Sequence, residues 1–102
     1  MEVQQIRVKI KVYGPSKEIV GGSGIVFLDF EGETTSLPHI LKKLVEAWPD
    51  LKSIICETLD CTSVASHIIV IVNGKAVPDK SFDSFQVKEN DDVTFSPFVV
   101  GG

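Results

Sequence analysis

The residues with the most evident chemistry are the last two of the sequence, Gly101 and Gly102. Glycine costs backbone entropy and has no side chain to pack, so two glycines after an apolar segment need an explanation. One interpretation is a frayed end with no role. The other is a narrow stalk that carries a carboxylate on Gly102, in which case this chain supplies no catalytic side chain of its own.

The other residues that could do chemistry are two cysteines, Cys56 and Cys61, and two histidines, His39 and His67. A structural zinc site needs four ligands, and the histidines fall in other elements, so we expect no metal site. No Cys–His or Ser–His–Asp pattern indicates catalysis. The sequence favours a cytoplasmic protein, so we expect both cysteines to be thiols rather than a disulfide.

Composition and charge exclude several classes of protein. The net charge of −4 argues against a nucleic-acid binder, which needs a basic surface. No apolar run is long enough to span a membrane, and the N-terminal residues begin directly with a strand pattern rather than a signal peptide. We therefore expect a cytoplasmic protein that binds neither nucleic acid nor membrane, and that docks on a basic partner.

The N-terminal third predicts two strands. Residues 6–12 alternate between apolar and basic side chains, which indicates a strand with one buried face and one basic face of Arg7, Lys9 and Lys11. That basic face is simply solvated, meets an acidic partner surface, or carries lysines that accept modification. Residues 14–24 predict a loop, and residues 25–30 predict a second strand. Its inward residues are Val26, Leu28 and Phe30, and its open face carries Ile25 and Phe27.

Residues 36–48 predict one helix. Ser36 is a suitable N-cap, and apolar residues recur at helical spacing along one stripe. Pro49 ends the helix. Residues 50–55 predict a further short helical turn, and residues 56–66 predict a surface loop.

The C-terminal third predicts three strands. Residues 67–72 are almost all β-branched, which indicates a strand buried on both faces. Asn73-Gly74 predicts a hairpin turn into a short partner strand. Residues 93–96 predict the last strand, with Val93 and Phe95 inward and Thr94 and Ser96 outward, and Pro97 ends it.

This order of elements predicts an α+β protein with one mixed sheet and one main helix across one face. The first and last strands then lie side by side in the middle, with residues 67–72 next to the last strand. That is the β-grasp, or ubiquitin-like, arrangement. We expect a β-grasp domain at residues 1–97 and a flexible C-terminal tail at residues 98–102.

After the predicted strand, strand and helix, the sequence contains the segments VNGK, NDD and VTFSPFVVGG in this order. They resemble the MoaD/ThiS family of ubiquitin-like sulfur carriers, which includes the small archaeal modifier proteins. The resemblance implies that a ubiquitin-activating-type enzyme adenylates the carboxylate of Gly102 with ATP. The activated glycine then becomes a thiocarboxylate, or forms an isopeptide bond with a target lysine. It also implies that the chain is not an enzyme and binds no cofactor.

The resemblance also implies partners and docking residues. The partners are the adenylating enzyme, a sulfur donor, and either a molybdopterin synthase large subunit or lysines of target proteins. The free protein is expected to be a monomer. Gly101 allows the tail to thread into the activating site, and the residues expected to dock are Phe95, Pro97, Phe98, Val99, Val100, Ile25 and Phe27. The alternative is a ubiquitin-like interaction module with an inert tail.

Overall fold

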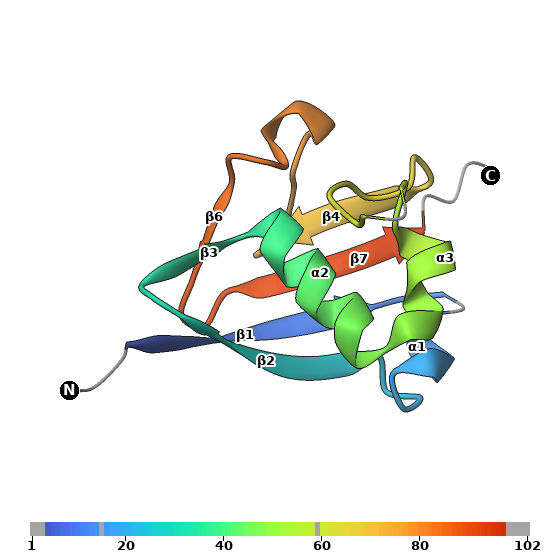
Figure 1. Ribbon diagram of the computed structural model, residues 1–102, viewed down its shortest axis with the longest axis horizontal. Coiled ribbons are helices and arrows are strands. Elements are labelled where there is room, and N and C mark those ends of the chain that lie inside the picture. Colours follow the sequence, from blue (N-terminus) through green and yellow to red (C-terminus); the bar gives the residue numbers. More distant parts are fainter. Residues whose placement is uncertain (1–3, 15, 59, 98–102) are drawn as a thin grey trace.

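The computed structural model describes residues 4–14, 16–58 and 60–97, and Figure 1 shows their arrangement. A five-stranded sheet has the strand order β2-β1-β7-β4-β5, and β3 and β6 form a separate two-stranded sheet. The strands are β1 (Gln5–Val12), β2 (Ile25–Glu31), β3 (Thr34–Ser36), β4 (Ile68–Val72), β5 (Lys75–Ala76), β6 (Gln86–Lys88) and β7 (Asp92–Pro97). The helices are α1 (Ser16–Ile19), α2 (Leu37–Ala47) and α3 (Lys52–Ile55), with 3₁₀ turns η1 (Pro49–Leu51) and η2 (Asp79–Ser81).

Strand β1 lies in the middle of the sheet, antiparallel to β2 and parallel to β7. Its four apolar residues are buried, and its basic residues lie on the other face, so the predicted alternation is confirmed. Strand β4 lies antiparallel to β7 on the far side. The predicted β-grasp arrangement, with the first and last strands adjacent, is therefore confirmed.

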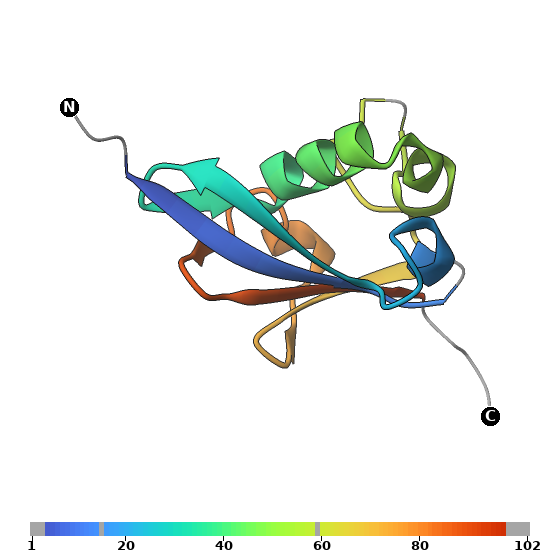
Figure 2. The same cartoon turned by 90° about the horizontal axis from the view of Figure 1, so that it is seen from below.

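Helix α2 crosses one face of the sheet, and α2 and α3 lie on the same side of it (Figures 1 and 2). The hydroxyl of Ser36 accepts a hydrogen bond from the His39 N–H at 3.2 Å, so the predicted N-cap is confirmed. The apolar stripe of α2 is buried against the sheet, and Trp48 is partly buried at the end of the helix. Pro49 ends α2, and η1 and α3 form the predicted short helical turn.

The hairpin between β4 and β5 turns at Asn73 and Gly74, whose φ angles are 52° and 84°. Positive φ at both central residues is the geometry that an Asn-Gly turn provides. The Asn73 side chain donates to the Asp91 carboxylate at 3.0 Å and accepts from the Asp92 N–H at 2.9 Å. The predicted turn thus also holds the start of β7 in place.

Two local predictions were wrong, and a third residue faces as predicted but is more buried than its outward position suggests. The segment predicted as a loop after β1 contains the short helix α1. Strand β4 is fully buried on one face only, because none of the described helices covers the other face, and Ile69 and Ile71 are half-buried there. Thr94 lies on that open face, as predicted, but it is buried, because it is paired between Lys11 of β1 and Ile71 of β4.

The sheet of β3 and β6 was not predicted. Each strand has three residues, which is too short for alternation to be recognised. Within it Thr35 pairs with Val87, and both side chains are buried. No helix among the described residues is long and apolar enough to cross a membrane.

Candidate functional site

Strand β7 carries the chain from the core toward the two glycines. The carbonyl of Phe95 accepts a hydrogen bond from the Tyr13 N–H at 3.1 Å, and Pro97 is aligned with Ile68 at the beginning of β4. The end of β7 is therefore held on both sides. Five predicted site residues lie outside the described residues, namely Phe98, Val99, Val100, Gly101 and Gly102.

Pro97 rests against the backbone of Gly14. Gly14 has a φ of 74°, and a Cβ atom built on it would lie 2.7 Å from Cγ of Pro97. Glycine is required here for two reasons, since an L-residue disfavours this φ and its Cβ would collide with the proline ring. This contact fixes where the chain leaves the sheet, and the sequence alone gave no sign of it.

Replacing Gly14 with alanine should therefore displace Pro97. We expect Gly14→Ala to lose about 1–2 kcal/mol of unfolding free energy from the left-handed φ alone, and more from the collision. Gly21→Ala is the matched control, because Gly21 has a φ of 97° with open space around it. Urea unfolding measures both costs, and NMR shifts at Ser96 and Pro97 should change only in Gly14→Ala. Equal losses in the two variants would show that the Pro97 contact contributes nothing.

Phe95 was predicted to dock with a partner, and the structure corrects this. Its side chain is 1% exposed and belongs to the hydrophobic core. The residue faces the helices because alternation along β7 places Val93 and Phe95 on the same inner face. Its side chain is therefore unavailable to a partner while the domain is folded. Pro97 is half-buried at the end of the strand.

The open face of the sheet carries exposed apolar side chains at one side. Ile25 is 41% exposed and Phe27 is 58% exposed, on the face away from α2, as predicted. Tyr13, which follows β1, is also exposed, and sequence reasoning did not single it out. These residues give the open face accessible apolar area, with Ile25 opposite Lys11 and Phe27 opposite Lys9 of β1.

The predicted basic face of β1 is largely neutralised. Arg7 forms a salt bridge with Asp29 at 2.9 Å, and Lys11 forms one with Asp92 at 3.1 Å. The hydrogen bond from Arg7 lowers the pKa of the Asp29 carboxyl, and the hydrogen bond to Asp92 raises the pKa of the Lys11 ammonium. Since the acids come from the neighbouring strands β2 and β7, this face offers an acidic partner little net charge.

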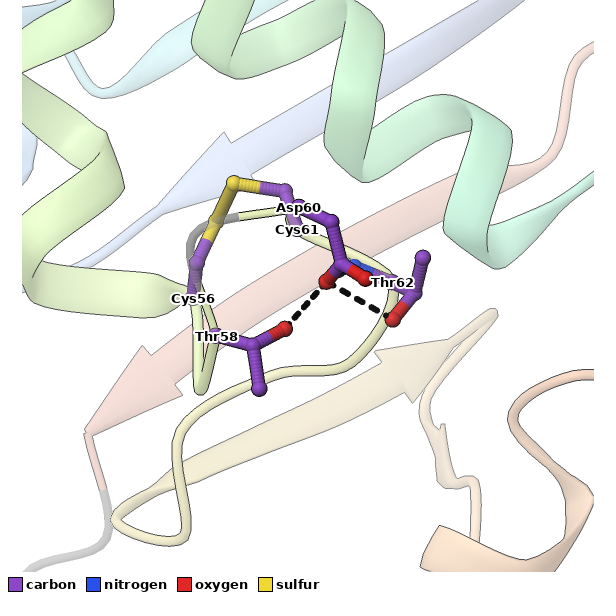
Figure 3. The surroundings of a disulfide bond; sticks show 5 residues. All are labelled: Cys56, Thr58, Asp60, Cys61 and Thr62. Carbon is purple, nitrogen blue, oxygen red and sulfur yellow. Dashed lines mark hydrogen bonds between the residues drawn. A yellow bond between two sulfur atoms is a disulfide. The ribbon is translucent and has the colours of Figure 1, made fainter.

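The cysteines form a disulfide, so the prediction of two thiols was wrong (Figure 3). Their Cα atoms lie 5.0 Å apart, within the usual range for a disulfide. The loop makes this approach possible, because Cys61 has a φ of 54° and its N–H bonds to the Thr58 carbonyl at 3.1 Å. The Asp60 carboxylate accepts hydrogen bonds from the hydroxyls of Thr58 and Thr62, which lower its pKa.

The prediction had rested on the expected compartment and not on loop geometry. Cys61 is buried in the core. Cys56, at the end of α3, forms an isolated β-bridge with Val64. The disulfide therefore closes the loop that leads into β4. No group of three or more His, Cys, Asp or Glu side chains that could hold a metal occurs within residues 4–14, 16–58 and 60–97.

Reduction of this disulfide should lower stability modestly. A loop closed over a sequence separation of five residues is expected to contribute about 2 kcal/mol to the free energy of unfolding. Urea unfolding with and without dithiothreitol measures this contribution. A Cys56→Ala, Cys61→Ala double variant is the control, and its midpoint should not respond to the reductant. An unchanged midpoint in the wild-type protein would contradict a stabilising disulfide.

Comparison with known proteins places this geometry in a family. The family model described as the ThiS family matches residues 10–102. A comparison with curated protein sequences finds no match. Small archaeal modifier protein 1 (SAMP1) from Methanosarcina acetivorans is 25% identical, with a TM-score of 0.70 over 97% of this chain and 99% of that chain. SAMP1 from Haloferax volcanii is 27% identical, with a TM-score of 0.71 over 94% and 99%.

A putative molybdopterin converting factor, subunit 1, from Pyrococcus furiosus is similar in fold. It is 16% identical, with a TM-score of 0.68 over 92% of this chain and 99% of that chain. The family match includes the end of β1 and the final glycines, and the solved structures share the β-grasp sheet. The chain therefore belongs to the ThiS family.

Proposed function

We propose that an ATP-dependent adenylating enzyme of the ubiquitin-activating type activates the carboxylate of Gly102. The protein then acts as a thiocarboxylate sulfur carrier, as a modifier conjugated to lysines of target proteins, or as both. One observation carries the proposal. The ThiS-family match extends through residues 101 and 102, and the central strand β7 leads toward them from a domain of that family.

The chemistry follows from the weak reactivity of a carboxylate. A carboxylate oxygen of Gly102 attacks the α-phosphorus of ATP, and pyrophosphate leaves. The acyl adenylate then carries AMP as a leaving group. On the carrier route a persulfide sulfur of the sulfur donor displaces AMP to give an acyl disulfide, and a thiol then cleaves its S–S bond, which releases the thiocarboxylate and leaves a disulfide on the donor. On the modifier route the amine of a target lysine displaces AMP to form an isopeptide bond. The enzyme must align ATP and carboxylate in a closed site, for which a narrow glycine stalk is suited.

The domain contributes binding rather than catalysis in this proposal. Phe98, Val99 and Val100 contact the activating enzyme as it receives the tail, and Gly101 lets the tail enter the site. Ile25 and Phe27 extend the contact across the open face, where both are exposed. The net charge of −4 favours a basic surface on the enzyme. Because the reaction consumes ATP, we place it in the cytoplasm.

The two routes have different support. The modifier route is supported by the likeness to SAMP1, whose name describes a modifier. The carrier route is supported by membership of the ThiS family and suggests a molybdopterin synthase large subunit as receiver. One activated glycine serves both routes, because they diverge only at the nucleophile that displaces AMP.

ATP–pyrophosphate exchange tests the proposal directly. Purified protein is mixed with the adenylating enzyme of its native host, ATP and labelled pyrophosphate. Exchange that depends on this protein supports adenylation of its carboxylate. Absence of exchange, with the enzyme active toward another β-grasp substrate, would favour an interaction module with an inert tail.

A further inference from the structure

A groove of about 730 Å³ lies between helix α2 and the edge strand β2. Phe30 lies at its base, and its ring meets the edge of the His39 ring at a centroid distance of 5.4 Å. Lys43 places its ammonium 4.7 Å from the centroid of the Phe30 ring. The groove lies at the opposite edge of the sheet from β5, so it is separate from the hairpin at Asn73.

Strand β2 is the outermost strand, and half of its backbone groups point away from the sheet. The N–H of Val12 bonds to the Gly24 carbonyl at 2.8 Å, and the N–H of Gly32 bonds to the Gln4 carbonyl at 2.7 Å. Hydrogen-bonded pairs alternate in an antiparallel ladder, so the even-numbered residues of β2 bond to β1. Phe27 and Asp29 therefore direct their N–H and C=O groups outward, toward the groove edge.

These outward groups are open to a further strand. The Asp29 carbonyl accepts a hydrogen bond from the Lys43 ammonium. Within the described part of the chain, no hydrogen bond is found to the Phe27 N–H, the Phe27 carbonyl or the Asp29 N–H. Exposed edge groups of this kind are a template for strand addition, and a lysine placed on the edge is a common device that limits it.

The two sides of this edge differ in character. On the groove side, α2 contributes Lys42, Lys43 and Glu46, and Glu31 of β2 also lines the groove. Neither lysine forms a salt bridge with a residue that the structure describes. The Asp29 side chain is turned to the open face, where it pairs with Arg7. On that open face Phe27 is exposed beside the edge. A strand added here would place alternate side chains next to Phe27 and next to the two lysines.

We propose that the edge of β2 binds an extended segment of a partner protein in which apolar and acidic residues alternate. The added strand pairs with the backbone of Phe27 and Asp29. Its apolar side chains cover Phe27, and its acidic side chains face Lys42 and Lys43. The Lys43 ammonium moves from the Asp29 carbonyl to a carboxylate of the partner, which frees that carbonyl for the new ladder.

A second copy of the chain is a poorer occupant. Pairing β2 with β2 would bring Asp29 and Glu31 of two copies onto one edge, together with two Lys43 ammonium groups. Both copies also carry a net charge of −4. Like charges placed opposite each other across strands are destabilising. These charges therefore disfavour a second copy of the chain at this edge.

The test uses an acetylated and amidated heptapeptide of alternating valine and aspartate. Hydrogen exchange of the isotope-labelled protein is followed by NMR during titration. We expect protection to rise at the amides of Phe27 and Asp29. The amides of Val26 and Leu28 already bond to β1 and should change little. A heptapeptide of alternating valine and lysine is the control for charge, and it should bind at least about tenfold more weakly.

Two pairs of variants separate charge from backbone pairing. Lys43→Glu should weaken binding of the Val-Asp peptide by about tenfold or more, whereas Lys75→Glu makes the same charge change on β5 and should have no effect. Phe27→Pro removes the outward N–H without removing a bond to β1, and Phe27→Ala keeps it. Binding should be lost in Phe27→Pro and only weakened in Phe27→Ala, with thermal melts confirming folding.

Several results would overturn the proposal. The first is that saturating Val-Asp peptide fails to slow hydrogen exchange at the amides of Phe27 and Asp29. The second is that the Val-Lys peptide binds as tightly as the Val-Asp peptide. The third is the same protection without peptide, accompanied by dimers in sedimentation, which would assign the edge to a second copy. These measurements are made without the adenylating enzyme, so adenylation of Gly102 is tested separately by ATP–pyrophosphate exchange.

Discussion

Deletion of Gly101 and Gly102 is expected to lower the rate of adenylation by at least about 100-fold while leaving the folded domain unchanged. The deletion moves the terminal carboxylate back by about 7 Å, and it places a β-branched valine at the new end. Misplacement of a reacting group by far less than this distance costs about 100-fold in rate. ATP–pyrophosphate exchange with the adenylating enzyme measures the effect.

Two controls make this experiment decisive. Thermal melting of the deletion variant should match that of the wild-type protein, because the last core residue among the described residues is Phe95. Gly102→Ala keeps the length of the tail and changes only the last residue, so it should retain more exchange than the deletion does. Undiminished exchange by the deletion variant would mean that the two glycines are inert, as in the alternative of an interaction module.

Replacing Phe95 with alanine is expected to cost about 3–5 kcal/mol of unfolding free energy. Phe95 is 1% exposed in the middle of the core, so its loss leaves a cavity between the sheet and the helices. A domain of this size has about 5–15 kcal/mol of stability, so this one change removes a large part of it. The melting temperature should fall by on the order of 15 °C, measured by circular dichroism.

Matched variants distinguish a core residue from a docking residue. Phe95→Leu keeps most of the volume and should cost far less than Phe95→Ala. Phe27→Ala removes the same aromatic ring from an exposed position, so its effect on stability should stay within about 0.5 kcal/mol. If Phe95→Ala melted like the wild-type protein but bound the adenylating enzyme less well, the original docking assignment would be restored.

Long, regular patterns allowed most of the fold to be predicted. The alternation in β1 and the stripe on α2 are each repeated several times, and both were confirmed. Asn73-Gly74 identified its hairpin because few other residues adopt positive φ so readily. The apolar stripe of α2 needs a sheet to pack on. The simplest sheet that these elements can form has β1 and β7 side by side in its middle.

Short or distant features could not be predicted in this way. Strands β3 and β6 pair residues that lie about fifty positions apart in the sequence, and each is too short to show a period. Helix α1 is four residues long and is followed by glycines, which indicated a loop. The disulfide depended on the left-handed conformation of Cys61, and nothing in the residue types around it predicted that conformation.

In the candidate site, a correct prediction from the sequence and a wrong one concern the same residue, Phe95. Alternation correctly placed Phe95 inward, yet the resemblance to a family of carriers led to its assignment as a docking residue. The structure agrees with alternation, because a strand side chain cannot serve the core and a partner at once. The contact between Gly14 and Pro97 could not be predicted from the sequence, since it joins the residues that follow β1 to the end of β7, far away in the sequence.

Mass spectrometry of the C-terminal tryptic peptide from the native host tests the central claim most directly. Residues 89–102 follow Lys88, contain no further Lys or Arg, and lack Met and Cys, so oxidation at sulfur cannot imitate a thiocarboxylate. We predict replacement of one terminal oxygen by sulfur in this peptide, or its attachment through Gly102 to lysines of other proteins. An unmodified carboxylate with no conjugates under every growth condition would contradict the account.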